Sequence, residues 1–254
     1  MLIDGVVAKG ASDAGIYVGQ SKDITVRFSR AEGNVAGIEI ENSRNALVTG
    51  NFVTRNTGGI LVFDLPSLPV MGGGNVRIEH NLVIANDTPN FAPKGNIVAS
   101  VRRGTGAMVM ANDNVWIENN VFDQNPTSQI MVVSYPRAFS DATYNPVPRR
   151  VTIGANTYGR GGYDPQIEGA PLLLQAFGGA LPPVLYDGLG DPRTTLALAP
   201  GTRAWTLGLA KLGADPATGK PGPATLPTSL PPLATPGTPV RIGAPAEMDA
   251  RIAG

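Results

Sequence analysis

The sequence predicts an all-β fold, a right-handed parallel β-helix, from two observations. A Gly-Ile strand recurs every 22 residues, beginning at Gly15, Gly37 and Gly59. Polar turn residues, mostly Asn, recur in register with it. Strands this short, with apolar residues at every second position, cannot bury an apolar face alone. Each coil must therefore stack on its neighbours.

A second short strand lies between successive copies of the first. Its copies are Ile24-Thr25-Val26, Ala46-Leu47-Val48, Val76-Arg77-Ile78, Val115-Trp116-Ile117 and Val151-Thr152-Ile153. One turn residue follows each copy, and we expect these side chains to stack in a single column: Ser29, Asn51, Asn81, Asn120 and Asn156. A further Asn follows five residues later in four coils: Asn34, Asn56, Asn86 and Asn125. Stacked Asn side chains bond to one another from coil to coil as amide ladders.

The repeat also predicts how the chain is organised. Extra residues form three inserts, 64–74 and 134–148 after the Gly-Ile strand and 87–104 before it. A solenoid places such inserts on one face, often its binding face. We expect the β-helix to span 1–160, a C-terminal packing or cap segment to span 161–213, and a flexible Pro-rich tail to span 214–254.

The first strand position is already occupied at Met1-Leu2-Ile3, with neither a cap nor a signal peptide before it. Open coils expose unpaired backbone, so a β-helix end is normally covered. We therefore interpret the chain as truncated at its N-terminus, or else as docking a partner there.

Composition excludes several classes of function. The 20 basic and 20 acidic side chains balance, which argues against a nucleic-acid partner. No stretch approaches the roughly 18 apolar residues of a membrane span. With no Cys and a single His, His80, thiolate and multi-histidine metal sites are excluded, and we interpret His80 as a turn residue. We expect no cofactor; calcium is the one ion that suits Asp- and Asn-rich loops, but no calcium-binding repeat occurs.

An apolar strip is expected on the outer face of the Gly-Ile strands. With Ile60, Ala107 and Ile130 pointing inward, the outward residues form this strip: Leu61, Phe63, Met108, Met110 and Met131. The strip is either the floor of a ligand groove or a surface covered by residues 163–213 or by a loop. We favour the cover, and so expect these side chains to be largely buried.

Several segments resemble bacterial parallel β-helix repeat proteins of the pectin-lyase-like group, with carbohydrate-binding and sugar-hydrolysis type repeats. The segments are 13–21, 35–43 and 57–66, together with 90–93, 95–98 and 110–113. The resemblance implies a right-handed β-helix, a periplasmic or extracellular location and a polysaccharide partner, but no catalytic mechanism. Relatives are longer at the N-terminus, which agrees with truncation. The chain has neither the Asp-Pro-His-Asp segment of alginate epimerases nor the acidic calcium cluster of pectate lyases.

Polar residues on or beside the inserts are the candidate site. A uronate lyase or epimerase needs a cation for the sugar carboxylate and a base for the C5 proton, which predicts Arg102 or Arg103 for the first role and Lys94 or Tyr135 for the second. A glycosidase needs two carboxylates, here Asp64 and Asp113. The candidate catalytic residues are Asp64, Lys94, Arg102 and Arg103, and the candidate substrate-binding residues are Asn90, Asn112, Asp113, Tyr135 and Arg137. The simpler interpretation is that these residues close turns or are solvated.

Three hypotheses for the function remain open at this stage. The chain is a carbohydrate-binding β-helix that holds a polysaccharide on its loop-flanked face, a lyase or epimerase on an acidic polysaccharide, or a structural module that docks a partner chain. For an enzyme, we expect Asp64, Lys94, Arg102 and Arg103 to share a pocket between inserts 64–74 and 87–104.

Overall fold

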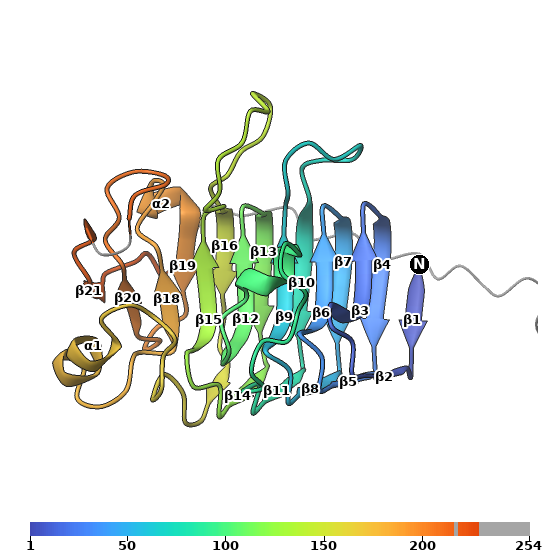
Figure 1. Ribbon diagram of the computed structural model, residues 1–254, viewed down its shortest axis with the longest axis horizontal. Coiled ribbons are helices and arrows are strands. Elements are labelled where there is room, and N and C mark those ends of the chain that lie inside the picture. Colours follow the sequence, from blue (N-terminus) through green and yellow to red (C-terminus); the bar gives the residue numbers. More distant parts are fainter. Residues whose placement is uncertain (216–217, 229–254) are drawn as a thin grey trace, which may run out of the picture.

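The computed structural model describes residues 1–215 and 218–228, and its strands form three sheets wound into one solenoid (Figure 1). Sheet A contains β1 (Leu2–Asp4), β4 (Lys22–Arg27), β7 (Arg44–Thr49), β10 (Gly74–Glu79), β13 (Asp113–Glu118), β16 (Arg149–Ile153) and β19 (Leu196–Leu198). Sheet B contains β2 (Val7–Lys9), β5 (Arg30–Glu32), β8 (Phe52–Thr54), β11 (Leu82–Ile84), β14 (Val121–Asp123) and β17 (Thr157–Tyr158). Sheet C contains β3 (Ala14–Gly19), β6 (Ala36–Glu41), β9 (Gly58–Phe63), β12 (Thr105–Met110), β15 (Ser128–Val133), β18 (Val184–Tyr186), β20 (Ala204–Thr206) and β21 (Gly222–Ala224). The helices are η1 (Ile97–Ser100), α1 (Ala170–Ala176) and α2 (Pro192–Thr195).

The strands stack in parallel with an unbroken register. In sheet C, Ile38 pairs with both Ile16 and Ile60, and Ala107 pairs with Ile60 and Ile130. Of the sheet pairings, only that of β21 with β20 is antiparallel among the described strands. Because each coil contributes one strand to each sheet in turn, the fold is the parallel β-helix that the 22-residue repeat predicts.

The interior of the solenoid is filled mainly by aliphatic side chains from all three sheets. Ile24 of sheet A, Val53 of sheet B and Ile60 of sheet C are fully buried in one continuous core. Burying each such side chain contributes roughly 1.5–3 kcal/mol. Branched side chains at every second position therefore stabilise each coil.

The predicted column of turn residues between sheets A and B is confirmed. The Asn81 Oδ1 accepts hydrogen bonds from the backbone N–H and the Nδ2 of Asn51, both at 3.0 Å. The Asn81 N–H and Nδ2 donate in turn to Asn120 Oδ1, and the same pair of bonds joins Asn120 to Asn156. At the other end, Ser29 donates its N–H to Asn51. These amides satisfy turn backbone groups that have no partner within their own coil.

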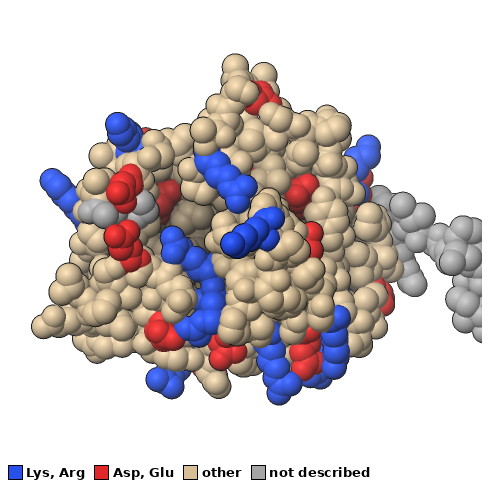
Figure 2. Space-filling model, in the orientation of Figure 1, with Lys and Arg blue, Asp and Glu red and all other residues tan. Residues whose placement is uncertain are grey.

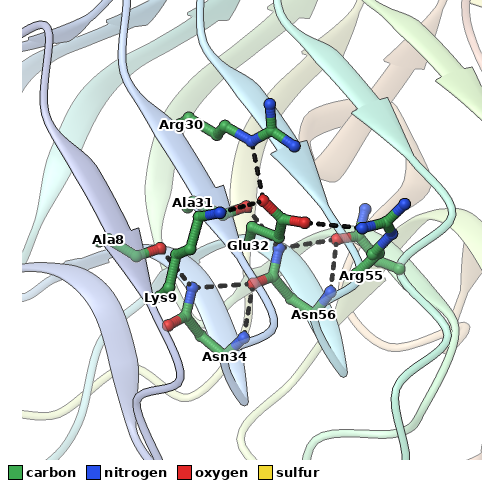
Figure 3. Close-up of polar contacts among 9 residues, drawn as sticks. Ala8, Lys9, Arg30, Ala31, Glu32, Asn34, Arg55 and Asn56 are labelled. Atoms are coloured by element: carbon green, nitrogen blue, oxygen red, sulfur yellow. Dashed lines mark hydrogen bonds and ion pairs between the residues drawn. The ribbon is translucent and has the colours of Figure 1, made fainter.

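The second Asn column, between sheets B and C, forms the same kind of ladder. Asn34 donates its N–H and Nδ2 to Asn56 Oδ1, at 2.9 and 3.0 Å, and also donates Nδ2 to the Ala8 carbonyl (Figure 3). The pattern continues through Asn86 to Asn125, whose Nδ2 donates to Gln129 Oε1. Two corners of the solenoid are thus fixed by buried amides.

A third ladder joins residues near the start of successive strands of sheet A. It was not predicted from the sequence. Asn45 Nδ2 donates to Asp23 Oδ1, and Asn75 Nδ2 donates to Asn45 Oδ1, each at 3.1 Å. These residues have positive φ values of 55–58°, which Asn and Asp adopt more readily than most side chains. The exposed turn position of His80 has the same conformation (φ 58°), so His80 occupies a turn as interpreted.

All three inserts border sheet C. Inserts 64–74 and 134–148 rise together from the upper edge in Figure 1, and Tyr144 Oη donates to the Asp64 carbonyl at 2.7 Å. Insert 87–104, which carries η1, crosses the outer face of β9 and β12. The inserts therefore surround one face, as the solenoid rule predicts.

The apolar strip on this face is covered. Leu61, Phe63 and Met131 are buried, whereas Met108 is half-buried. The strip contacts insert 87–104 through Ile97. Side chains of α1, such as Leu173 and Leu174, and the following Phe177 cover its C-terminal end around Met131. The cover comes from both expected sources and leaves one opening, above Met108.

Sheets A and C extend beyond residue 160, the expected end of the β-helix. Strands β18 and β20 continue sheet C, and β19 continues sheet A. The 22-residue spacing does not reveal these strands because residues 161–183, which include α1, lengthen the connection before them. Most of the expected tail, 216–217 and 229–254, lies outside the described residues.

Replacing Asn81 with Ala should lower the free energy of unfolding by about 3 kcal/mol or more. The change leaves the buried Asn51 N–H and Nδ2, the Val48 carbonyl and Asn120 Oδ1 without bonds that Asn81 provides, and each such loss costs about 1–3 kcal/mol. Urea unfolding measures the effect. Asn145→Ala, in the exposed insert 134–148, is the control and should change stability by less than about 1 kcal/mol. Equal losses in the two variants would refute a stabilising ladder.

Candidate functional site

A cavity of about 480 Å³ lies on the outer face of sheet C, above Met108. Its floor comes from the apolar strip, and its walls come from insert 87–104, the start of insert 134–148 and residues 167–214. Figure 2 shows basic side chains on two sides of a hollow in this face. The floor and walls are mainly apolar, and charged groups lie at the mouth.

The prediction that the site is a cleft between inserts 64–74 and 87–104 is wrong. Insert 64–74 provides none of the residues that line the cavity. This loop contacts insert 134–148 instead, through the Tyr144 hydroxyl and the Asp64 carbonyl. The second wall is residues 167–214, whose return to sheet C through β18 and β20 the sequence did not predict.

Asp64 is buried and holds its own insert in place. Its Oδ2 accepts from the Gly73 N–H at 2.7 Å, and its Oδ1 accepts from Asn112 Nδ2 at 2.8 Å. Burial raises the pKa of the Asp64 carboxyl to about 6, although both hydrogen bonds oppose that rise. The carboxyl closes the loop by joining its two ends and does not reach the cavity.

The three candidate cations separate. Arg102 lines the cavity and donates Nη1 to the Gln166 carbonyl at 2.5 Å. Arg103 turns away and pairs with Asp164. Lys94 is exposed and does not line the cavity. The four candidate catalytic residues therefore share no pocket. Only Arg102 lines the cavity, because Asp64 closes its insert, Arg103 pairs with Asp164 and Lys94 is exposed to solvent.

Three candidate substrate-binding residues make structural contacts and do not line the cavity. Asn90 Nδ2 donates to the carbonyls of Val98 and Val101, which folds insert 87–104 around η1. Asn112 donates to Asp64, as described above. Asp113 begins β13 on sheet A and pairs with Arg150. Each has the turn or pairing role that the simpler interpretation assigned to it.

Tyr135 and Arg137 do line the cavity. The Tyr135 ring is buried edge-on against Phe139 and Tyr144, with ring centroids 6.3 and 5.5 Å away. Arg137 is exposed at the mouth. The cavity thus unites Tyr135, Arg102 and Arg137, three of the nine predicted site residues, on two different inserts.

Two carboxyl groups complete the lining. Asp187 is buried, and its oxygens accept from the N–H groups of Ser134 and Leu189, at 2.6 and 2.9 Å. Burial raises the pKa of the Asp187 carboxyl. Glu168 is exposed at the mouth. No group of three or more acidic or His side chains among residues 1–215 and 218–228 is arranged to hold a metal ion.

The sequence predicted that residues 163–213 or a loop would cover the apolar strip, but it did not identify which of their residues line the cavity. Leu185 and Leu207 line it from residues in and beside β18 and β20, outside the visible repeat. Ile97 lines the cavity from insert 87–104, where short-range patterns predict only a loop.

A second polar cluster lies at the N-terminal end of sheet C. The Tyr17 hydroxyl donates to Glu41 Oε1 at 2.9 Å, while the neighbouring Glu39 is buried and its Oε1 has no hydrogen-bond partner within the described structure. Burial, together with the charges of Asp13 and Glu41, raises the pKa of Glu39 to about 8. This cluster is acidic, whereas the mouth of the cavity carries two arginines.

Because of Asp64, the folded protein should become less stable as the pH rises. Its pKa is about 3.8 when unfolded and about 6 when folded, so its contribution to stability is full below pH 4 and is lost as the pH passes 6, by up to roughly 3 kcal/mol. Urea unfolding of wild type and Asp64→Asn at pH 4 and pH 7 measures this. The variant should lose less stability over that range than wild type does. An identical pH dependence in the two proteins would contradict the assignment.

Glu39→Gln should stabilise the protein at high pH. The pKa of Glu39 rises from 4.5 to about 8 on folding, so stability present below pH 4.5 is lost as the carboxyl ionises through pH 8, by up to roughly 5 kcal/mol. Thermal unfolding should show nearly equal melting temperatures at pH 4.5 and a higher one for Glu39→Gln at pH 8.5. The exposed Asp87→Asn is the control and should match wild type at both pH values. A Gln variant that is no more stable than wild type at pH 8.5 would refute a buried, ionising Glu39.

Comparison with known proteins agrees with this geometry. A family model described as the right-handed β-helix region matches residues 1–143. Searches of curated proteins and of solved structures each returned no match. No helix in the described part of the chain has the length and apolar character needed to cross a membrane. The match covers more than half of the 254 residues and coincides with the stacked coils, so the chain belongs to the right-handed β-helix family.

Proposed function

We propose that the protein is a carbohydrate-binding β-helix that holds an acidic polysaccharide across the cavity mouth on the outer face of sheet C. One observation carries the proposal: Arg102 and Arg137, from two separate inserts, line the same cavity beside the Tyr135 ring. Guanidinium groups bind carboxylates with paired hydrogen bonds, and aromatic rings provide an apolar surface for ligands. The periplasmic or extracellular location implied by the family resemblance belongs to the same proposal.

The ligand's charge follows from the residues at the mouth. Asp187 is engaged by two backbone N–H groups, so Glu168 is the one exposed carboxylate among the lining residues, against two exposed arginines. The remaining positive charge favours a uronate-containing chain over a neutral glycan. Binding of this kind weakens as salt rises, because the charges are exposed.

A lyase or epimerase is the second candidate, and the shared cavity of Arg102 and Tyr135 is the observation that favours it. Arg102 would neutralise the uronate carboxylate, and Tyr135 would accept the C5 proton as its phenolate, after losing its own hydroxyl proton. The mainly apolar floor below them favours binding over catalysis, because it offers few further polar groups to orient a sugar ring.

Arg137→Ala should weaken binding of an acidic polysaccharide about tenfold or more, since a charge-assisted contact is lost. Calorimetric titration against polyuronates and neutral glucans measures it, at low and high salt. Arg55→Ala, on the turn after β8 of sheet B, removes the same charge far from the cavity and should bind like wild type. Equal affinity of wild type for acidic and neutral chains, or equal losses in both variants, would refute the proposal.

The same mixtures test the lyase alternative through the ultraviolet absorbance of new unsaturated sugar ends. A binding module produces none. Production of unsaturated ends that stops in Tyr135→Phe would establish the lyase in place of the binder.

A further inference from the structure

The floor of the cavity is chemically unlike its mouth. Below the arginines, the lining is mainly aliphatic, methionine and aromatic, as at Phe63, Met108, Met110 and Met131. Its polar side chains are few, and Ser100, Thr105 and Asp187 are already hydrogen-bonded within the protein, which leaves the Ser134 hydroxyl. Most hydroxyl groups of a sugar would therefore lose their hydrogen bonds to water there without replacement, which is costly. The floor therefore selects an apolar group, whatever binds at the mouth.

We propose that this cavity binds a flexible aliphatic chain with an anionic head, the chain lying over Met108 and the head paired with Arg102 and Arg137. The volume of about 480 Å³ falls within the range of small-molecule sites, which are mostly apolar with a few polar groups that fix orientation. Three of the lining residues are methionines, whose unbranched, polarisable side chains adapt to a chain of variable shape.

Charge complementarity supports the anionic head. Arg137 is exposed with no partner among the described residues, and Arg102 makes one bond, to a backbone carbonyl that does not neutralise its charge. The opposing carboxylate at the mouth is Glu168, since Asp187 is buried under two N–H donors. A fatty carboxylate satisfies both ends of the cavity at once.

This inference goes beyond the carbohydrate proposal and stands without it. A chain of this kind comes either from a free fatty acid or from an acyl or alkyl group carried on a sugar. Both sources share the aliphatic chain, so the arms of the experiment must separate them.

The test is calorimetric titration of the full chain with saturated fatty acids of eight to fourteen carbons, below their micelle-forming concentrations. Each buried methylene should tighten binding about fourfold, until the chain fills the cavity and the gain stops. A fatty alcohol of the same length should bind less tightly than the acid, and Arg102→Ala/Arg137→Ala should reduce the acid to the affinity of the alcohol. Affinity that does not depend on chain length, or equal binding of acid and alcohol, would overturn the proposal.

Two substitutions at the floor locate the chain. Met108→Trp fills the cavity and should abolish fatty-acid binding, whereas Leu172→Trp, on the exposed face of α1, should leave it unchanged. Met108→Ala enlarges the site, so affinity should keep rising up to a longer fatty acid than it does in wild type. Binding unaffected by both Met108 variants would place the ligand elsewhere and overturn the proposal.

The last comparison separates the sources and the two proposals. Tighter binding of a dodecyl glucuronide than of dodecanoate identifies a sugar-borne chain, and the reverse identifies a free acid; both keep the aliphatic chain and the anionic head. Polysaccharide without acyl groups tests the carbohydrate proposal alone, because Met108→Trp leaves the arginines at the mouth in place. Failure of one binding activity is therefore distinguishable from failure of the other.

Discussion

The structure depends on buried amide ladders at the corners of the solenoid. A turn between two short strands leaves backbone N–H and C=O groups that its own coil cannot pair, and inside a protein such groups must be satisfied. Asn does so because one side chain accepts from the previous coil and donates to the next. Asn51, Asn81 and Asn120 repeat this arrangement over successive coils. The ladder fixes the position of every corner, so the strands between corners keep one register and their apolar residues meet in one core.

The same constraint determines where function can reside. The interior is filled mainly by aliphatic side chains, and the Asn side chains at the corners are already hydrogen-bonded to neighbouring coils. At sheet B, the Glu32 carboxylate pairs with Lys9, Arg30 and Arg55 (Figure 3), and the hydrogen bonds from Lys9 and Arg30 lower its pKa to about 2. The outer face of sheet C is where inserts add side chains without disturbing the repeat, and there the cavity forms.

The repeat made the fold and both Asn ladders predictable, because each residue's partner is its own counterpart one coil away. The third ladder, which Asn114 extends by donating Nδ2 to Asn75 Oδ1, had a signal too. An Asp or Asn is the second residue of the strands β4, β7, β10 and β13, but a single residue at the start of a strand does not by itself indicate stacking. The site was harder. Tyr135 and Arg137 were predicted because they follow a strand, but the roles of Asp64 and Arg103 depend on Gly73 and Asp164, partners that no spacing reveals. The wall around Leu185 requires knowing how residues 161–213 return to sheet C.

Hydrogen exchange at the corners tests the central claim most directly, because it reports on each ladder bond in the native protein. The amides of Asn51, Asn81 and Asn120 lie in turns, yet each donates to the Asn of the next coil. They should exchange as slowly as the strand amides of Ile60 and Val62, and far more slowly than exposed amides of insert 134–148. Exchange of the three Asn amides at the rate of those exposed loop amides would show that the ladders do not hold the coils together, and would contradict the account.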